Sequence, residues 1–370
     1  MSSDPTVALT QAPLTVVTRG GAIESTHFGS AAVVDRKGTL LYAAGDPHTL
    51  TFTRSALKPL QALPFVVADG HTRFGLTQAE LALLCASHSG EPRHVEAAAA
   101  ILTKAGASVA DLQCGAHPPL GFEARGVPPP SPPYSPLAHN CSGKHGGMLA
   151  CCVLCGYPTS DYLALEHPLQ QAIRRAVARF TEIPEEQLIA GVDGCSAPNY
   201  AMPLAHLALA YAKLVSPEPD SDFGHAPKIL ADAMTAHPEM VSGEERSDLA
   251  FARAGRGDWV AKIGAEGVQA LAIKSRGWGI AVKVADGSVR GLHPATVALL
   301  AQLDLLDQEA TAELAQWATP RLRNHRGVVT GLARGVVSLT ESGGGSTSQI
   351  TRRANELWPG EAVSYGKRAP

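Results

Sequence analysis

Short, largely apolar runs bounded by turn residues occur near the start of the chain and again late in it. Residues 14–53 contain three such runs, TVVTRG, GSAAVVD and GTLLYAAG, separated by Gly and by an Asp-Arg-Lys-Gly turn signal. Late in the chain, VQALAIKS (268–275) and IAVKVADG (280–287) flank a Gly-Trp-Gly turn. Short runs bounded by turn residues predict strands, and the late pair predicts a β-hairpin.

Helical periodicity fills most of the chain between these runs. Thr77 and Glu80 form a capping box that predicts a helix from there to about Ala86. Further helices are expected at 54–66, 94–105, 169–180, 201–215, 229–235 and 295–306. The proline-rich segment 126–136 predicts an extended surface loop, and SGGGSTS (342–348) predicts a flexible one. NCSGKHGG (140–147) is expected to be a loop that leads into a helix from Met148.

Strands at both ends and helices in the middle predict one antiparallel sheet covered by helices, an α+β fold. A regular alternation of strand and helix is not evident, so a doubly wound parallel sheet is not expected. We expect an N-terminal tail over residues 1–13 and a single domain over 14–370, with room for two lobes.

Composition and charge narrow the classes of function. Hydrophobic residues make up 45% of the chain, enough to fill a core, and the formal net charge is −3. This balance gives no reason to expect a nucleic-acid or membrane surface. We find neither a secretory signal nor a run of about 18 apolar residues, so a soluble cytoplasmic protein is expected.

The seven cysteines do not predict a disulfide framework, because their number is odd and three of them form the apolar cluster Cys151-Cys152-Val-Leu-Cys155. Buried free thiols are the expected state for most of them. A metal-sensing or redox regulator remains an alternative. It would require an exposed thiol of low pKa, and the apolar surroundings of the cluster argue against one.

Two serine–lysine combinations could carry acyl-transfer chemistry. Ser55 and Lys58 have the S-x-x-K spacing, which places a hydroxyl and an amine one helical turn apart. A desolvated lysine can take the serine proton at neutral pH. Ser87 lies in CASHSGE (85–91), and Lys262 begins KIGAEG just ahead of the predicted hairpin. Taken singly, each could equally be a solvated turn or helix residue.

A second constellation contains thiols and charged groups. HNCSGKHGG (139–147) supplies Cys141, Lys144 and His145, and GVDGCS (191–196) supplies Asp193 and Cys195. Two thiols with nearby polar groups could bind zinc, although the spacing is not that of a zinc finger. Two buried thiols without a metal are the alternative.

Together these blocks resemble one family. RGGAIESTH (19–27), RSALKP (54–59), CASHSGE (85–91), HNCSGKHGGML (139–149), GVDGCSAPN (191–199) and KIGAEG (262–267) occur in the order typical of the asparaginase II family, the thermolabile, rhizobial type of L-asparaginase. The resemblance runs from about residue 14 to about residue 365. Six blocks in order are far more specific than any one of them.

The resemblance implies a fold similar to serine β-lactamases and serine-dependent glutaminases, and hydrolysis of L-asparagine to L-aspartate and ammonia. It implies two catalytic pairs, Ser55 with Lys58 and Ser87 with Lys262. It further implies a zinc site at Cys141, Lys144 and Cys195, a substrate pocket that includes Arg54 and His145, and a homodimer. Asp193 lies close to the implied metal site in sequence.

Chemical reasoning adds roles for these residues. Ser55 can supply the attacking oxygen and Lys58 the base, while Ser87 and Lys262 can relay the proton. Arg54 is a candidate for the substrate carboxylate and Asp193 for its ammonium. Zinc is not needed as a Lewis acid in this scheme, so we expect it to order the pocket. Sequence does not decide between Ser55 and Ser87 as nucleophile; Ser55 is favoured because its lysine is one turn away.

Other functions remain open at this point. A glutaminase or another β-lactamase-like serine acyl hydrolase would use the same serine–lysine machinery. A small-molecule binding protein without catalysis is a different class, disfavoured because both serines and both lysines are present.

Overall fold

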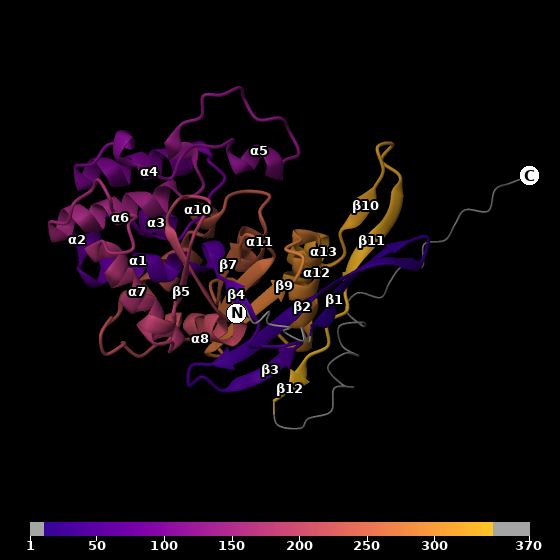
Figure 1. Cartoon of the computed structure of the whole chain (residues 1–370). Coiled ribbons are helices and arrows are strands. Elements are labelled where there is room, and N and C mark those ends of the chain that lie inside the picture. Colours follow the sequence, from indigo (N-terminus) through magenta and orange to yellow (C-terminus); the bar gives the residue numbers. More distant parts are fainter. Residues whose placement is uncertain (1–10, 343–370) are drawn as a thin grey trace, which may run out of the picture.

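A large antiparallel sheet forms the framework of the molecule (Figure 1). The computed structural model describes residues 11–342. Within them the nine-stranded sheet has the order β10-β11-β1-β2-β9-β8-β7, with β3 beside β2 and β12 beside β3. Its strands are β1 (Ala12–Arg19), β2 (Ala22–Asp35), β3 (Leu40–Ala44), β7 (Trp259–Gly264), β8 (Val268–Ile273), β9 (Trp278–Val284), β10 (Arg321–Arg323), β11 (Val329–Gly335) and β12 (Thr340–Glu341).

A smaller sheet and most of the helices lie between β3 and β7 in the sequence. The small sheet has the order β4-β6-β5, from β4 (Leu50–Phe52), β5 (Ile189–Val192) and β6 (Pro198–Pro203). The α-helices are α1 (Lys58–Val67), α2 (Gly70–Arg73), α3 (Gln78–Leu84), α4 (Pro92–Ala105), α5 (Leu120–Ala124), α6 (Ser142–Cys155), α7 (Pro168–Thr181), α8 (Leu204–Leu214), α9 (Ala226–Ala236), α10 (Pro238–Val241), α11 (Ser247–Ala254), α12 (Val289–Gln302) and α13 (Gln308–Ala318). Short 3₁₀ helices are η1 (Arg54–Leu57), η2 (Val109–Asp111), η3 (Pro136–Ala138) and η4 (Glu185–Gln187).

The central strands of the large sheet are buried on both faces, and successive side chains along them point to opposite faces. Val33 and Leu271 belong to the core that includes α11, α12 and α13. Their neighbours Ala32 and Ala270 belong to the larger core that includes α1, α3, α6, α7 and α8. The small residues on this second face let α8 lie directly on the sheet, where it contacts β2, β8 and β9. Figure 1 shows the two helical groups on opposite sides of the strands.

The α+β architecture with an antiparallel sheet is confirmed. The N-terminal strands join the late hairpin as expected, because β2 pairs with β9 from Gly29 with Val284 to Asp35 with Trp278. The capping box of Thr77 and Glu80 is present at the start of α3. Residues 1–10 of the expected tail and 343–348 of the glycine–serine segment lie outside the described residues, and β1 already begins at Ala12.

Three local expectations are wrong. Residues 142–147 are the first turns of α6 and not a loop before a helix at Met148. Residues 201–203 belong to β6, so the apolar helix α8 begins only at Leu204. The helix expected at 295–306 begins at Val289 and ends at Gln302. In each case an apolar or glycine-containing run fits two kinds of element locally, and its tertiary neighbours decide between them.

The early start of α6 has a visible cause. A Cβ on Gly143 would lie 2.4 Å from the carbonyl oxygen of Leu83, and one on Gly147 would lie 2.8 Å from a methyl carbon of Leu84. These glycines bring the first turns of α6 against α3, and the whole segment is buried. Burial in a packed helix offsets the usual entropic cost of helical glycine, about 1 kcal/mol per residue.

Gly279 marks the closest approach of α8 to the sheet, and its substitution tests this packing. A Cβ there would lie 1.7 Å from the carbonyl oxygen of Ala208, so Gly279→Ala forces the helix off β9. We expect a loss of unfolding free energy of about 3 kcal/mol or more in urea unfolding. The control is Gly194→Ala, where a Cβ meets nothing within 4 Å. Equal stability of both variants would contradict the close packing.

Candidate active site

The N-terminal end of α1 presents Arg54, Ser55 and Lys58 from one short turn. Arg54 has a φ of 49°, a left-handed conformation that is costly for a residue with a side chain. Asn199 on β6 holds it there, because its amide oxygen accepts from Arg54 N at 2.9 Å and its amide nitrogen donates to Arg54 O at 2.9 Å. Strain held in this way is typical of functional sites.

Lys58 is buried and bonds to the segment that follows α3. Its Nζ donates to Ser87 Oγ at 2.9 Å and to the Ala86 carbonyl at 2.5 Å, with the Asn140 carbonyl at 3.4 Å. Lys58 and Ser87 are 1% and 3% exposed. The structure therefore brings these two predicted residues together, although they were assigned to different pairs.

Lys262 points from β7 toward α11 and is fully buried. Its Nζ donates to Asp248 Oδ2 at 3.0 Å and to the Ile263 carbonyl at 2.9 Å. Burial, opposed by Asp248 and assisted by the Lys58 charge, lowers the pKa of Lys262 to about 8. Within residues 11–342 its hydrogen-bond partners do not include Ser87, and the catalytic pairing of Ser87 with Lys262 that the resemblance implies stays a prediction.

Ser55 is half-buried beside this cluster. Among the described residues its hydroxyl has no hydrogen-bond partner, and the catalytic pairing of Ser55 with Lys58 stays a prediction. Lys58 instead donates to Ser87 and to the carbonyls of Ala86 and Asn140, because a buried amine needs hydrogen-bond partners. Ser55 is thus the more accessible of the two serines and is free to bond to a ligand.

A pocket of about 430 Å³ opens next to Arg54. Asp193, Asn199, Glu266 and Lys283 also line it. Arg54 Nε donates to Asp193 Oδ1 at 2.8 Å, and Glu266 lies 3.9 Å from the same guanidinium. Burial raises the pKa of Asp193, but hydrogen bonds from Gly194 N and Arg54 outweigh it, so the pKa is lowered and the carboxylate stays charged.

The predicted metal ligands form a buried cluster behind these groups. Lys144 Nζ donates to Cys195 Sγ at 3.0 Å, and Cys141, Lys144 and Cys195 are all 4% exposed or less. The hydrogen bond with Cys195 lowers the pKa of Cys141 well below its usual value, against the effect of burial. Among the described residues, no three His, Cys, Asp or Glu side chains are grouped as a metal site, so Lys144 would have to be the third donor.

His145 lies in this thiol cluster rather than in the pocket beside Arg54. It is fully buried, and its Nδ1 is 2.7 Å from the hydroxyl of Tyr162. Its Nε2 has no hydrogen-bond partner in the described part of the chain. A buried ring nitrogen without a partner is uncommon, and Cys195 and Lys144 are among the charged neighbours that act on the pKa of His145. The predicted contact of His145 with substrate stays a prediction.

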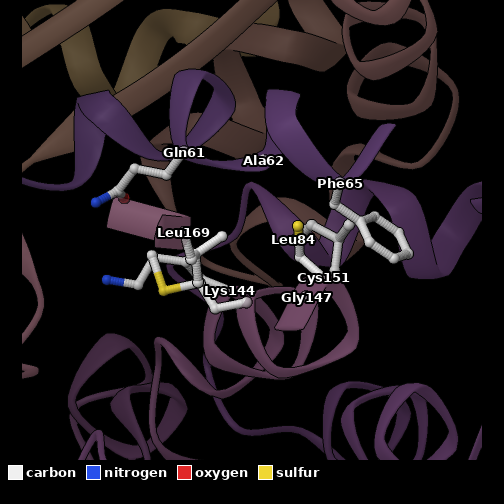
Figure 2. A pocket seen from close by; sticks show the side chains of 9 residues that line it. Gln61, Ala62, Phe65, Leu84, Lys144, Gly147, Cys151 and Leu169 are labelled. Atoms are coloured by element: carbon white, nitrogen blue, oxygen red, sulfur yellow. The ribbon is translucent and has the colours of Figure 1, made fainter. Parts of the chain in front are cut away.

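Lys144 also lines a very small cavity (Figure 2). Its volume of about 10 Å³ has room for about one water molecule. Figure 2 shows the polar ends of Gln61 and Lys144 on one side and the ring of Phe65 on the other. The cavity is too small for a substrate, so the pocket beside Arg54 is the better candidate.

Sequence reasoning missed two residues that organise the site. Asp248 follows no recognisable motif, and its pairing with Lys262 arises only when α11 packs on β7. Asn199 stands at the end of the GVDGCSAPN block, but nothing local indicates that it holds Arg54. A polar residue that acts through a tertiary contact leaves no periodic signal.

The remaining cysteines do not favour a redox regulator. All seven are free, and Cys155 is exposed while the other six are buried. Burial raises the pKa of Cys152 to about 12, the opposite of what a reactive thiol needs. The expectation of buried free thiols is confirmed for all except Cys155.

Comparison with solved structures finds low similarity to several proteins. A β-lactamase from Mycobacterium bovis is 15% identical over 78% of this chain and 95% of its own, with a TM-score of 0.39. The native form of Mglu is 18% identical over 76% and 65%, with a TM-score of 0.34. EstCE1, a hydrolase with promiscuous acyltransferase activity, is 11% identical over 84% and 93%, with a TM-score of 0.35. TM-scores this low do not by themselves establish a shared fold.

The remaining comparisons concern the sequence and its helices. No curated protein matches the chain. None of the helices between residues 11 and 342 is both long and apolar enough to cross a membrane. The family model described as L-asparaginase II matches residues 15–334, a span that contains every predicted site residue. The chain belongs to the L-asparaginase II family.

Proposed function

We propose that the protein hydrolyses L-asparagine to L-aspartate and ammonia through a serine ester. Membership of the L-asparaginase II family supports a hydrolase that acts on an amide. The observation that carries the proposal is the buried Lys58–Ser87 hydrogen bond, with Lys262 nearby and the unbonded hydroxyl of Ser55 at the edge of the cluster.

In the proposed reaction Ser55 Oγ attacks the carbon of the side-chain amide, and its proton passes to a neutral lysine amine of the cluster. The protonated lysine then gives this proton to the nitrogen of the tetrahedral intermediate. The C–N bond breaks and ammonia leaves. A water then attacks the ester carbon and the C–O bond to Ser55 breaks, which restores the serine and yields aspartate. Protons balance within each half of the cycle: the amine passes the serine proton to the departing nitrogen in the first half, and a water proton to the serine oxygen in the second.

The lysines are suited to this exchange of protons. Lys58 is three residues from Ser55 and is hydrogen-bonded to Ser87, so Ser87 can relay a proton between the amine and the pocket. Lys262 has a pKa of about 8, so part of it is neutral in mildly alkaline solution. The positive charge of Lys58 repels that of Lys262, and this repulsion helps keep the Lys262 amine neutral.

The pocket beside Arg54 is proposed to bind the α-amino group. Asp193 is charged and lines the pocket, which suits an ammonium ion. Arg54 donates to the same carboxylate and so fixes its orientation.

We further propose that Cys141, Lys144 and Cys195 hold a zinc ion. The donors fit, because thiolates and a neutral nitrogen are zinc ligands, and the unpartnered Nε2 of His145 faces the same cluster. Bound there, zinc would supply a fixed positive charge that orders the thiols beside Lys58. We also propose, from the family, a homodimer in the cytoplasm.

A zinc-site variant gives a readout that does not depend on activity. Cys195→Ser is expected to lower the zinc content from about one ion per chain to near zero, measured by elemental analysis, and to lower the Tm. Cys152→Ser is the control, because that buried thiol lies outside the cluster. Equal zinc content in both variants would contradict the assignment.

Ammonia release from L-asparagine and L-glutamine, measured side by side, tests the proposed function. We expect turnover of asparagine and little of glutamine, although one methylene contributes only about 1–3 kcal/mol of discrimination. Faster release from glutamine would contradict the proposed asparaginase activity and support a glutaminase activity instead. No release from either substrate by folded protein would refute both.

A further inference from the structure

The segment from Val241 to Asp248 connects the two halves of the serine–lysine cluster. Val241 O accepts from Ser87 N at 2.8 Å, and Ser242 O accepts from Ser89 Oγ at 2.7 Å. At the other end, Asp248 bonds Lys262 at 3.0 Å. Arg246 stands between these contacts, at the residue that precedes α11.

The carbonyl of Arg246 accepts from Ala250 N at 3.3 Å, but its guanidinium has no hydrogen bond or ion pair with any residue between 11 and 342. Its side chain is half-buried, and burial lowers its pKa, with Asp248 and Glu123 acting in the opposite direction. Arg246 in turn is one of the charges that lower the pKa of Lys262, so the guanidinium lies near that amine. A half-buried arginine with five donors and no acceptor is suited to an anionic ligand.

The other cations of the site already have partners. Arg54 is paired with Asp193, with Glu266 close by. Lys283 donates to the carbonyls of Glu266 and Val284, and Lys262 is paired with Asp248. Arg54 therefore meets two carboxylates, an arrangement that favours the substrate's ammonium over its carboxylate.

We propose that Arg246 binds the α-carboxylate of the substrate. This inference rests on the proposed function and differs from the expectation that Arg54 binds that carboxylate. The planar guanidinium matches a carboxylate with two parallel hydrogen bonds. Substrate binding supplies the acceptor that Arg246 lacks, while the amide extends toward Ser55. Arg246 thus selects amides that carry a carboxylate.

The test combines substrate and protein changes. β-Alaninamide is asparagine without its α-carboxylate, and it keeps the amine and the amide. Wild-type protein should have a kcat/KM about 100-fold lower for β-alaninamide than for asparagine. Arg246→Gln should lower kcat/KM for asparagine about 100-fold and change that for β-alaninamide little, so that the preference disappears. Arg246→Lys should retain part of the preference, because it keeps the charge without the planar fork.

Two control variants separate this role from others. Arg253→Gln removes an exposed arginine of the same helix that pairs with Glu244, and should match wild type on both substrates. Arg54→Gln should weaken both substrates alike, because both carry the amine that Asp193 binds.

The outcomes distinguish the two proposals. Wild-type protein that hydrolyses asparagine but does not prefer it over β-alaninamide overturns the inference without any variant. An equal loss on both substrates in folded Arg246→Gln also overturns it and leaves the proposed function intact. Wild-type protein that releases no ammonia from asparagine overturns both.

Discussion

Ser55→Ala should lower kcat for ammonia release from asparagine by about 10⁴-fold or more, because Ser55 supplies the oxygen of the ester in the proposed reaction. The hydroxyl has no partner among the described residues, so its loss leaves no hydrogen bond unmade and the protein should fold normally. Calorimetry should still show asparagine binding. Acid-quenched mass spectrometry should detect the acyl adduct in wild-type protein and not in the variant.

Ser87→Ala is the matched comparison. It removes the acceptor of Lys58 at 2.9 Å inside the protein, so we expect a smaller loss of kcat together with a lower Tm. An adduct that persists in Ser55→Ala and disappears in Ser87→Ala would assign the nucleophile to Ser87.

Asp248→Asn should be the most destabilising single change in the site. It leaves the buried Lys262 without its counter-ion, which costs about 3–5 kcal/mol of unfolding free energy. Urea unfolding measures this loss. Asp232→Asn, which weakens the half-exposed pair with Lys274, should cost about 1 kcal/mol or less.

The same variant should also shift the pH dependence of activity. Asp248 raises the pKa of Lys262 against burial, so its removal lowers that pKa below the wild-type value of about 8. The neutral amine then persists to lower pH. The acidic limb of the kcat profile should therefore move to lower pH, at whatever activity remains. A limb that stays in place would show that Lys262 does not take part in the proton exchange.

The main strands of the large sheet and the start of α3 could be predicted because short stretches of sequence determine them. The short apolar runs bounded by turn residues in β2 and in the hairpin β8–β9, and the capping box at Thr77, each depend on a few adjacent residues. Strands β5, β6, β7, β10 and β11 were not predicted, since their burial depends on what packs over them.

The candidate site could be predicted only as a set of residues. The six blocks contain Ser55, Lys58, Ser87 and Lys262, and the structure gathers them around one cluster. The hydrogen-bond partners of the two lysines could not be predicted. Lys58 donates to Ser87 and Lys262 donates to Asp248 because the fold buries these acceptors beside them. Asp248 and Arg246 belong to a segment without a motif.

The pairing of β1 with β11 affects how the chain can be made. Thr15 pairs with Gly335, so the first described strand finds one of its neighbours only after the whole segment between these two residues has been made. During translation β1 has an open hydrogen-bonding edge, and β2 and β3 likewise await β9 and β12. Contacts of such long sequence separation slow folding and leave strand edges available to other chains. Expression yield should therefore depend on chaperones and growth temperature more than the stability of the finished protein suggests.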